Sequence, residues 1–263
     1  MKTAIVTLAA GARMEPIAKL SIPLMMKYAE NIKSDFIRLS PRLANKFQGI
    51  LNYEKFQIFN LFSYYERIIF LDADILIAPA APSLFDVVDE EHLGVFIASR
   101  YSDLHNPSVE AILCILGEIA WQREARNPEI YESFNSGVLV CSRKTGEYFG
   151  KEMRPAEVWA KFDSHNCYMS DQTFMNYVAQ KYSLALADIG YQFNHTLAPG
   201  KSSHRFRSHM IHYAGVSHRE ANWFNRPSKI AKMRSDHFIL SKRSLSNLAS
   251  SHPFLVRMID HVL

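Results

Sequence analysis

Apolar residues along the chain form two kinds of pattern, short β-rich runs and segments in which they recur every three or four positions. The short runs predict strands at 3–9, 34–40, 67–77, 94–99, 133–143 and 207–215. The helical spacing predicts helices at 16–31, 52–66, 111–124 and 171–182. Strands and helices alternate through about residue 190, which predicts an α/β fold with a mainly parallel sheet flanked by helices. Sheets of this kind bind ligands at the carboxyl ends of their strands.

The run "RIIFLDADILI" (67–77) places two acidic residues inside an apolar strand. On one strand, Asp72 and Asp74 would project to the same side. Two carboxylates that close repel each other and lose hydration among apolar neighbours. Mg²⁺ and Mn²⁺ prefer oxygen ligands and are usually held by one or two carboxylates together with substrate phosphates. The pair therefore predicts a site for a hard divalent cation, and the alternative is a pair of capping or turn residues.

The segment "FLDADILI" resembles the DxD strand of the GT-A nucleotide-sugar glycosyltransferases. It is most similar to glycosyltransferase family 8, which includes glycogenin-like and galactosyltransferase members. Other segments resemble that family in the same order along residues 3–215: "VTLAAG", "FNSGVLV", "SDQTFMN" and "IHYAG". The resemblance implies a Rossmann-like GT-A fold and a metal-dependent hexosyltransferase. It would move a sugar from a nucleotide-sugar, expected to be UDP-linked, to an acceptor hydroxyl with retention of configuration.

The resemblance also implies roles for individual residues. The ligands of a Mn²⁺ or Mg²⁺ ion would be Asp72, Asp74 and His212. The residues at the reaction centre would be Asn135, Asp171 and Gln172. The donor-binding residues would be Leu8, Ala9, Lys55, Asp72, Ser136, Gly137, His218 and Arg219. Gly137 would let the backbone approach a ligand closely.

Each of these positions also has a structural explanation. His212 lies among apolar residues, as a buried core histidine does. Asn135, Ser136 and Gly137 all favour turns. Asp171 follows Ser170 at the start of a predicted helix, where an acidic residue commonly acts as an N-cap.

Two positions depart from the family pattern. The family often has a lysine where this chain has His218, which is a poorer contact for a diphosphate at neutral pH unless a phosphate raises its pKa. Arg219 is the expected substitute. Met14 stands about where some members place an aromatic residue against the base. The identity of the donor therefore stays open.

Charge is distributed unevenly along the chain. Residues 201–263 contain 11 basic residues (Lys or Arg) and 3 acidic ones (Asp or Glu). The preceding residues contain 19 basic and 23 acidic residues. A basic tail favours an anionic partner, and a solvated basic helix face is the alternative. We expect a catalytic domain at 1–219 and a helical segment at 220–263, packed on that domain or facing a membrane. The expected acceptor is a glycan, a lipid-linked sugar or a protein, and no nucleic acid partner is expected.

Cysteine content and the apolar runs bear on the cellular location. The three cysteines form no CxxC pair, and their odd number disfavours a disulfide framework, so a reducing compartment is expected. The apolar run near the start has about seven residues and predicts a buried strand instead of a signal peptide. No run approaches the roughly 20 apolar residues that span a bilayer. A cytoplasmic protein is therefore expected, with peripheral membrane contact through the tail as an option.

Two other kinds of function also fit parts of this sequence. The run "IIFLDADILI" also resembles the nucleophile strand of haloacid-dehalogenase phosphatases. Those enzymes usually carry this strand near the N-terminus, with Thr or Val where this chain has Leu76, and they need a later acidic pair that is missing here. A non-catalytic sugar- or nucleotide-binding protein is the other alternative, and the filled motif positions disfavour it.

Overall fold

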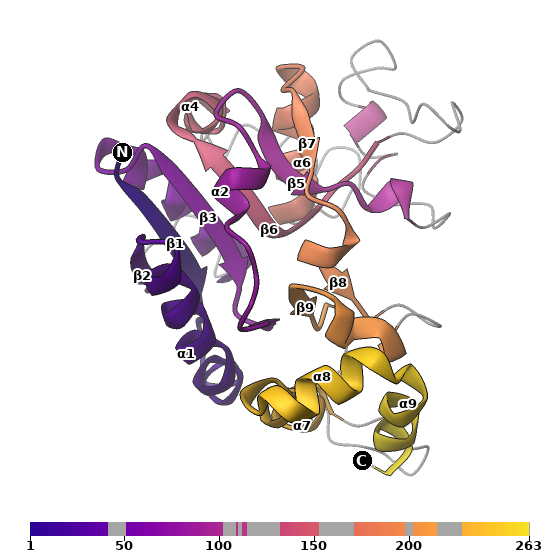
Figure 1. Cartoon of the computed structure of the whole chain (residues 1–263). Coiled ribbons are helices and arrows are strands. Elements are labelled where there is room, and N and C mark those ends of the chain that lie inside the picture. The colour runs from indigo at the N-terminus through magenta and orange to yellow at the C-terminus, as the bar shows by residue number, and fades with distance from the viewer. Residues whose placement is uncertain are drawn as a thin grey trace.

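The computed structural model describes residues 1–41, 51–101, 109, 112–114, 132–152, 171–197, 202–214 and 228–262 (Figure 1). Within these residues, six strands form one sheet in the order β2-β1-β3-β6-β5-β7. The strands of this main sheet are β1 Thr3–Leu8, β2 Asp35–Leu39, β3 Arg67–Asp72, β5 Leu93–Phe96, β6 Asn135–Ser142 and β7 Leu186–Asp188. A smaller sheet has the order β4-β9-β8, formed by β4 Ile75–Ile77, β9 Met210–His212 and β8 His195–Thr196.

The main sheet is mixed because β6 runs against its neighbours. Strand β1 is parallel to β2 and β3, and β5 is parallel to β7, whereas β6 is antiparallel to both β3 and β5. Leu71 near the end of β3 pairs with Val138 near the start of β6. The first residues of β6 therefore lie at the same edge of the sheet as the last residues of β3.

Helices cover both faces of the main sheet, as an α/β fold with flanking helices requires (Figure 1). Along β3, Ile68 and Phe70 belong to one apolar cluster and Ile69 and Leu71 to another. The first cluster includes residues of η1 (Leu51–Ser63), α4 (Arg143–Glu152) and α6 (Asp171–Lys181). The second includes residues of α1 (Glu15–Asn31) and α2 (Leu84–Val87). An unbroken apolar run is what a strand buried on both faces needs.

The helix predicted over 52–66 forms as the 3₁₀-helix η1. Tyr53, Phe56, Phe59 and Phe62 are spaced by three residues and are all buried. A 3₁₀-helix has three residues per turn, so side chains at this spacing align on one face. The aromatic spacing of three is compatible with this tighter winding.

The prediction of one strand over 67–77 is wrong. Strand β3 ends at Asp72, the chain turns at Ala73 and Asp74, and β4 belongs to the smaller sheet. The change of sheet follows from pairing with β9, because Tyr213 N–H donates to the carbonyl of Asp74 at 3.0 Å. Asp72 therefore ends one strand and Asp74 lies in the turn after it, so the two do not project from a single strand.

Two other predicted elements differ in extent. The strand predicted over 207–215 is reduced to β9, because residues Ser202–Arg207 form the 3₁₀-helix η5. The helix predicted over 111–124 lies mostly outside the described residues. The remaining short 3₁₀-helices are η2 Ala98–Arg100 and η4 Tyr191–Phe193.

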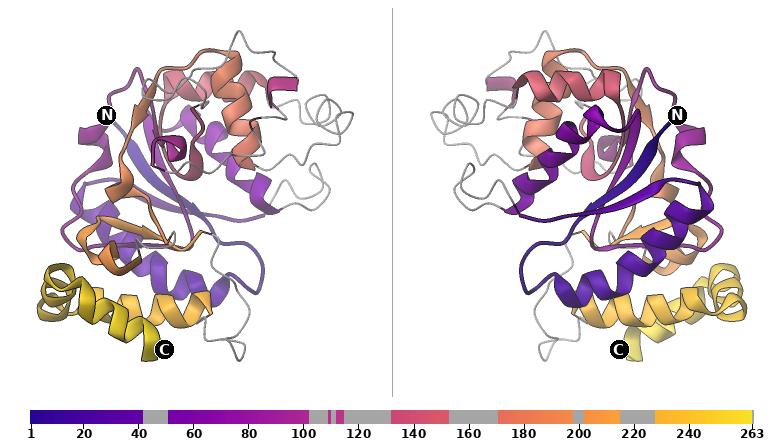
Figure 2. Two further views of the ribbon diagram at one scale, coloured as in Figure 1. Left: turned by 90° about the vertical axis from the view of Figure 1, so that its right-hand side faces the viewer. Right: turned by 90° about the vertical axis from the view of Figure 1, so that its left-hand side faces the viewer.

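Three helices end the chain: α7 Lys229–Ser241, α8 Arg243–Ser251 and α9 Pro253–Val262. They gather at one end of the molecule, with α7 beside α1 (Figure 2). Met233 of α7 lies in an apolar cluster with Ile17 of α1 and Ile211 of β9. Helix α7 thus contributes to the protein core, and the division at residue 219 stays a prediction.

A buried ion pair also ties α7 to the rest of the protein. Asp236 and Arg205 are both 0% exposed, and Arg205 Nε lies 2.6 Å from Asp236 Oδ2. Tyr213 donates a further hydrogen bond to the same carboxylate. None of the described helices combines the length and apolar character needed to cross a bilayer.

Candidate active site

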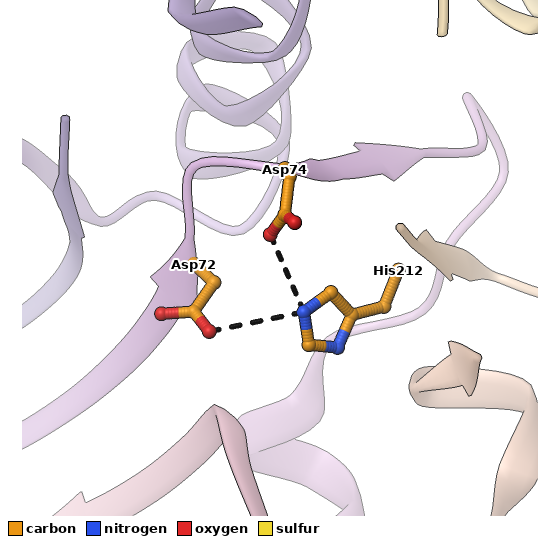
Figure 3. Close-up of side chains that lie close together, drawn as sticks. All are labelled: Asp72, Asp74 and His212. Carbon is orange, nitrogen blue, oxygen red and sulfur yellow. Dashed lines mark ion pairs between the residues drawn. The ribbon is translucent and has the colours of Figure 1, made fainter. Parts of the chain in front are cut away.

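Three potential metal ligands meet where the two sheets join (Figure 3). Asp72 ends β3, Asp74 follows in the turn, and His212 pairs with Ile75 in the antiparallel contact of β4 and β9. His212 Nε2 lies 3.3 Å from Asp74 Oδ1 and 3.7 Å from Asp72 Oδ2. One atom from each residue lies within 4.8 Å of the others. The turn at Ala73 thus brings together groups that a continuous strand would separate from His212.

The surroundings of the two carboxylates differ. Burial raises the pKa of Asp72, although Lys55 and His212 oppose that rise. Burial by itself would also raise the pKa of Asp74, but the neighbouring His212 and Lys229 outweigh it and hold that pKa well below its usual range. Lys229 Nζ lies 2.6 Å from Asp74 Oδ2. Asp74 is therefore held as a carboxylate by two neighbours, while Asp72 is more costly to ionise.

The donor set fits a hard divalent cation. Oxygen ligands lie about 2.1 Å from Mg²⁺, so two ligands of one ion are about 3–4 Å apart. The distances from His212 Nε2 to the two carboxylates, 3.3 and 3.7 Å, fall in that interval. The other ring nitrogen, Nδ1, lies 2.7 Å from Asn194 Oδ1, which leaves Nε2 toward the carboxylates. Asp72, Asp74 and His212 could therefore hold Mn²⁺ or Mg²⁺.

Asp171 and Lys55 form a second charged group beside this one. Lys55 Nζ lies 2.5 Å from Asp171 Oδ2 and 3.2 Å from Asp72 Oδ1. Ser136 Oγ also donates to Asp171 Oδ2 at 2.9 Å. Burial alone would lower the pKa of Lys55, but Asp171 and Asp72 outweigh it and raise that pKa. Lys55 is therefore a buried cation that links the predicted metal ligands to the predicted reaction centre.

The amide side chains of Asn135 and Gln172 contact each other. Asn135 Nδ2 donates to Gln172 Oε1 at 3.1 Å, and the backbone N–H of Ser136 donates to the same oxygen at 3.4 Å. Asp171 and Gln172 begin α6, where an acidic residue interacts favourably with the helix dipole. The start of β6 and the start of α6 thus bring the three predicted reaction-centre residues together.

The structure gives a different reason for the glycine at position 137. A Cβ at this position would lie 2.2 Å from His212 Cε1 and 2.9 Å from His212 Nδ1. The space that a side chain would fill is taken by the imidazole ring. Gly137 therefore makes room for His212, which sequence reasoning had not anticipated.

The predicted nucleotide-contacting residues lie at the same sheet edge. Leu8 is in register with Asp72 across β1 and β3, and Ala9 follows it. The carbonyl of Ala9 accepts a hydrogen bond from Arg38 Nη2 at 3.2 Å. Contact of Leu8 and Ala9 with a nucleotide stays a prediction. His218 and Arg219 lie outside the described residues.

Sequence reasoning missed two residues of the site. Lys229 lies 155 positions from Asp74, and its only sequence signal is the excess of basic residues in the tail. Asn194 is 0% exposed and donates from Nδ2 to Asn135 Oδ1 at 2.9 Å. A polar residue within the aromatic segment "YQFNH" is a weak signal that this amide has buried partners.

Comparison with known protein families decides the class of the protein. Residues 12–218 match the description "Glycosyl transferase family 8". The chain belongs to this family. It is therefore a glycosyltransferase, and neither a haloacid-dehalogenase phosphatase nor a non-catalytic binding protein is favoured. None of the curated proteins compared with this family 8 glycosyltransferase matches it.

Solved structures agree with a GT-A fold. The galactosyltransferase LgtC in complex with donor and acceptor sugar analogs has a TM-score of 0.57 at 14% identity, covering 94% of this chain and 95% of LgtC. A glycosyltransferase involved in the glycosylation of the major capsid of PBCV-1 has a TM-score of 0.53 at 12% identity, covering 90% and 99%. GlyE of Streptococcus pneumoniae TIGR4 has a TM-score of 0.53 at 11% identity, covering 95% and 63%. These likenesses establish the fold.

Proposed function

We propose that this family 8 glycosyltransferase moves a hexose from a UDP-linked sugar to an acceptor hydroxyl, with Mn²⁺ or Mg²⁺ bound by Asp72, Asp74 and His212. One observation carries the proposal. The group of possible metal ligands lies beside Asp171, because Lys55 contacts both Asp72 and Asp171. A nucleotide-sugar needs both a metal site and a group near its sugar. Its diphosphate pairs with cations, and its sugar must be held at the reacting carbon.

The charges of the site support a diphosphate ligand. Three carboxylates, Asp72, Asp74 and Asp171, are balanced by the ammonium groups of Lys55 and Lys229. With His212 in the neutral form that binds metals, these side chains together carry one net negative charge, and a divalent cation would make the group positive. A bound cation would neutralise the charge that develops on the departing diphosphate. The group then becomes suited to a diphosphate only when the metal is present.

Retention is proposed from the family resemblance, and the contacts of Asp171 fit an electrostatic role for this residue. Its Oδ2 is engaged by Lys55 at 2.5 Å and by Ser136 at 2.9 Å. A carboxylate oxygen with these two partners is poorly placed to remove a proton from an attacking hydroxyl. We infer that Asp171 stabilises positive charge on the sugar electrostatically, while Asn135 and Gln172 orient it.

The test is nucleotide-sugar turnover by the full chain. A panel of UDP-sugars would be incubated with Mn²⁺, with Mg²⁺ and with excess EDTA, and released UDP measured with and without simple sugar acceptors. We expect turnover only when the cation is present. We also expect Asp74→Asn to abolish turnover without unfolding the protein. The anomer of the first product, read by NMR, would report retention or inversion. Full activity in EDTA contradicts the metal site, and an inverted product contradicts only the stereochemistry.

We further propose that the C-terminal helices contact an anionic membrane peripherally, where a lipid-linked acceptor would reside. In support, large apolar side chains are exposed on these helices: Phe238 (57%), Leu248 (46%), Phe254 (71%) and Met258 (52%). Exposed basic residues lie on or between the same helices, among them Lys242, Arg243 and Arg257. Apolar side chains that enter the headgroup region and basic ones that pair with anionic lipids are the combination that peripheral binding uses.

A further inference from the structure

A line of amide side chains runs from the predicted sugar-binding residues to the predicted metal ligand. His212 Nδ1 lies 2.7 Å from Asn194 Oδ1, and Asn194 Nδ2 lies 2.9 Å from Asn135 Oδ1. Asn135 Nδ2 continues the line to Gln172 Oε1 at 3.1 Å. Asn194 and His212 are buried, at 0% and 2% exposure. The line therefore connects the two halves of the site through the protein interior.

One backbone group fixes the direction of every bond in this line. The N–H of Gly137 lies 3.0 Å from the Asn135 side chain and can only donate, so the atom it meets is the oxygen Oδ1. The Asn194 atom that faces the same oxygen must also donate, and it is therefore Nδ2. That leaves Asn194 Oδ1, which can only accept, facing His212 Nδ1. His212 therefore carries a proton on Nδ1, and Nε2 is the ring nitrogen that faces Asp72 and Asp74.

We propose that Asn194 is a positioning residue for the divalent cation. It holds a proton on His212 Nδ1, so that Nε2 is the ring nitrogen left to bind the cation. Through Asn135, it also ties the orientation of that ligand to the residues expected to hold the sugar. The inference rests on the proposed function, because it gives Asn194 a role only if His212 binds a metal. Groups that orient a metal-binding histidine typically contribute about 10- to 100-fold in metal affinity.

A purely structural role for Asn194 is the alternative, since a buried amide with satisfied partners stabilises a fold in any case. Asn176 provides a matched control. It is 1% exposed, and its side chain bonds the backbone of Phe134 and the carbonyl of Gln172. No contact between Asn176 and His212 is among its hydrogen bonds. Asn176→Ala therefore removes a buried amide of the same kind without touching the proposed ligand.

The first measurement is the affinity for Mn²⁺ alone, from the loss of the free-ion EPR signal on adding the full-length protein. We expect Asn194→Ala to weaken binding about 10- to 100-fold, and Asn176→Ala to leave it within about twofold of wild type. Equal binding by wild type and Asn194→Ala would overturn the inference alone. A wild type that binds no Mn²⁺ would overturn the proposed metal site and this inference together.

The second measurement needs no metal and no variant of Asn194. The ¹⁵N spectrum of wild-type protein labelled at histidine shows which ring nitrogen of His212 carries the proton, with the His212→Gln protein identifying the signal. A proton on Nδ1 supports the inference, whether or not Nε2 also carries one in the metal-free protein, and a ring protonated on Nε2 alone overturns it. This measurement decides the matter even if Asn194→Ala fails to fold.

Discussion

Lys229 Nζ lies 2.6 Å from Asp74 Oδ2, so a lysine of the C-terminal helix α7 pairs with a predicted metal ligand. Both residues are buried, at 7% exposure for Asp74 and 6% for Lys229. The ammonium thus competes with a cation for the same carboxylate. The basic tail of the sequence therefore does more than provide charge at the surface, because one of its lysines takes part in the candidate site.

Removing Lys229 should strengthen binding of Mn²⁺ in the absence of donor. Two unit charges about 4 Å apart interact by about 4 kcal/mol at an effective dielectric constant of 20, so even a heavily screened repulsion matters. We expect Lys229→Met to bind Mn²⁺ at least about threefold more tightly, measured by EPR titration. Lys242→Met, which removes an exposed charge at the far end of α7, should bind like wild type. Weaker binding by Lys229→Met would show that the lysine orients Asp74 instead of competing for it.

Adding one methyl group at Gly137 should disturb the metal ligand His212. The new Cβ would stand 2.2 Å from His212 Cε1, so the ring must move. We expect Gly137→Ala to lose about 1–3 kcal/mol of unfolding free energy and to bind Mn²⁺ about tenfold or more weakly. Gly150→Ala is the control, because nothing lies within 4 Å of its added Cβ. In helix α4, that change should be neutral or stabilise the protein by up to about 1 kcal/mol. Wild-type affinity in a folded Gly137→Ala protein would contradict the close packing.

Neutralising Asp171 should affect catalysis more than donor binding. A charge that faces a developing positive sugar acts mainly in the transition state. We expect Asp171→Asn to lower kcat about 100-fold with a smaller change in donor affinity measured by calorimetry. A loss of donor affinity equal to the loss of turnover would instead make Asp171 a binding residue only.

Asp171→Asn should also lower the free energy of unfolding, because it removes the ion pair between Asp171 and Lys55. Asp171→Asn leaves Lys55 with Asp72 as its remaining carboxylate partner among the ion pairs of the described residues, which should cost up to about 3 kcal/mol. The stability lost in the double variant Lys55→Met/Asp171→Asn should differ from the sum of the losses in the two single variants. We expect a coupling energy of about 0.5–3 kcal/mol, measured by urea unfolding. Additive costs would mean that the pair contributes nothing to stability.

Membrane contact should depend on apolar residues of α9 and on salt. We expect co-sedimentation with vesicles rich in phosphatidylglycerol, weakening as the Debye length falls from about 10 Å at 0.1 M salt to about 3 Å at 1 M. Phe254→Ser/Met258→Ser should reduce it, whereas Met26→Ser/Tyr64→Ser, at exposed apolar positions elsewhere, should not. Equal, negligible sedimentation of all three proteins would contradict membrane contact. Truncation before α7 is unsuitable as a test, because it would remove Lys229 and the core residue Met233.

Local patterns in the sequence predicted five of the six strands of the main sheet, all but β7, and most of the residues that meet at its edge. Strands such as β3 are buried on both faces, so their apolar runs are unbroken and easily recognised. Helix α6 begins at the predicted Asp171 because an acidic residue suits a helix N-terminus wherever the helix packs. Helical periodicity predicted a helix over 52–66 but not its 3₁₀ winding, which only the structure shows.

Contacts between distant segments decided the rest. An apolar run from 67 to 77 has the same pattern whether it forms one buried strand or two, and pairing of β4 with β9 across more than 130 residues produces the turn at Asp74. The antiparallel direction of β6, which brings Asn135 to the end of β3, depends likewise on pairing in the sheet. Asn194 and Lys229 belong to the site only through side-chain contacts with Asn135, His212 and Asp74. Periodicity reports whether a side chain is buried, whereas its partners depend on how the whole chain folds.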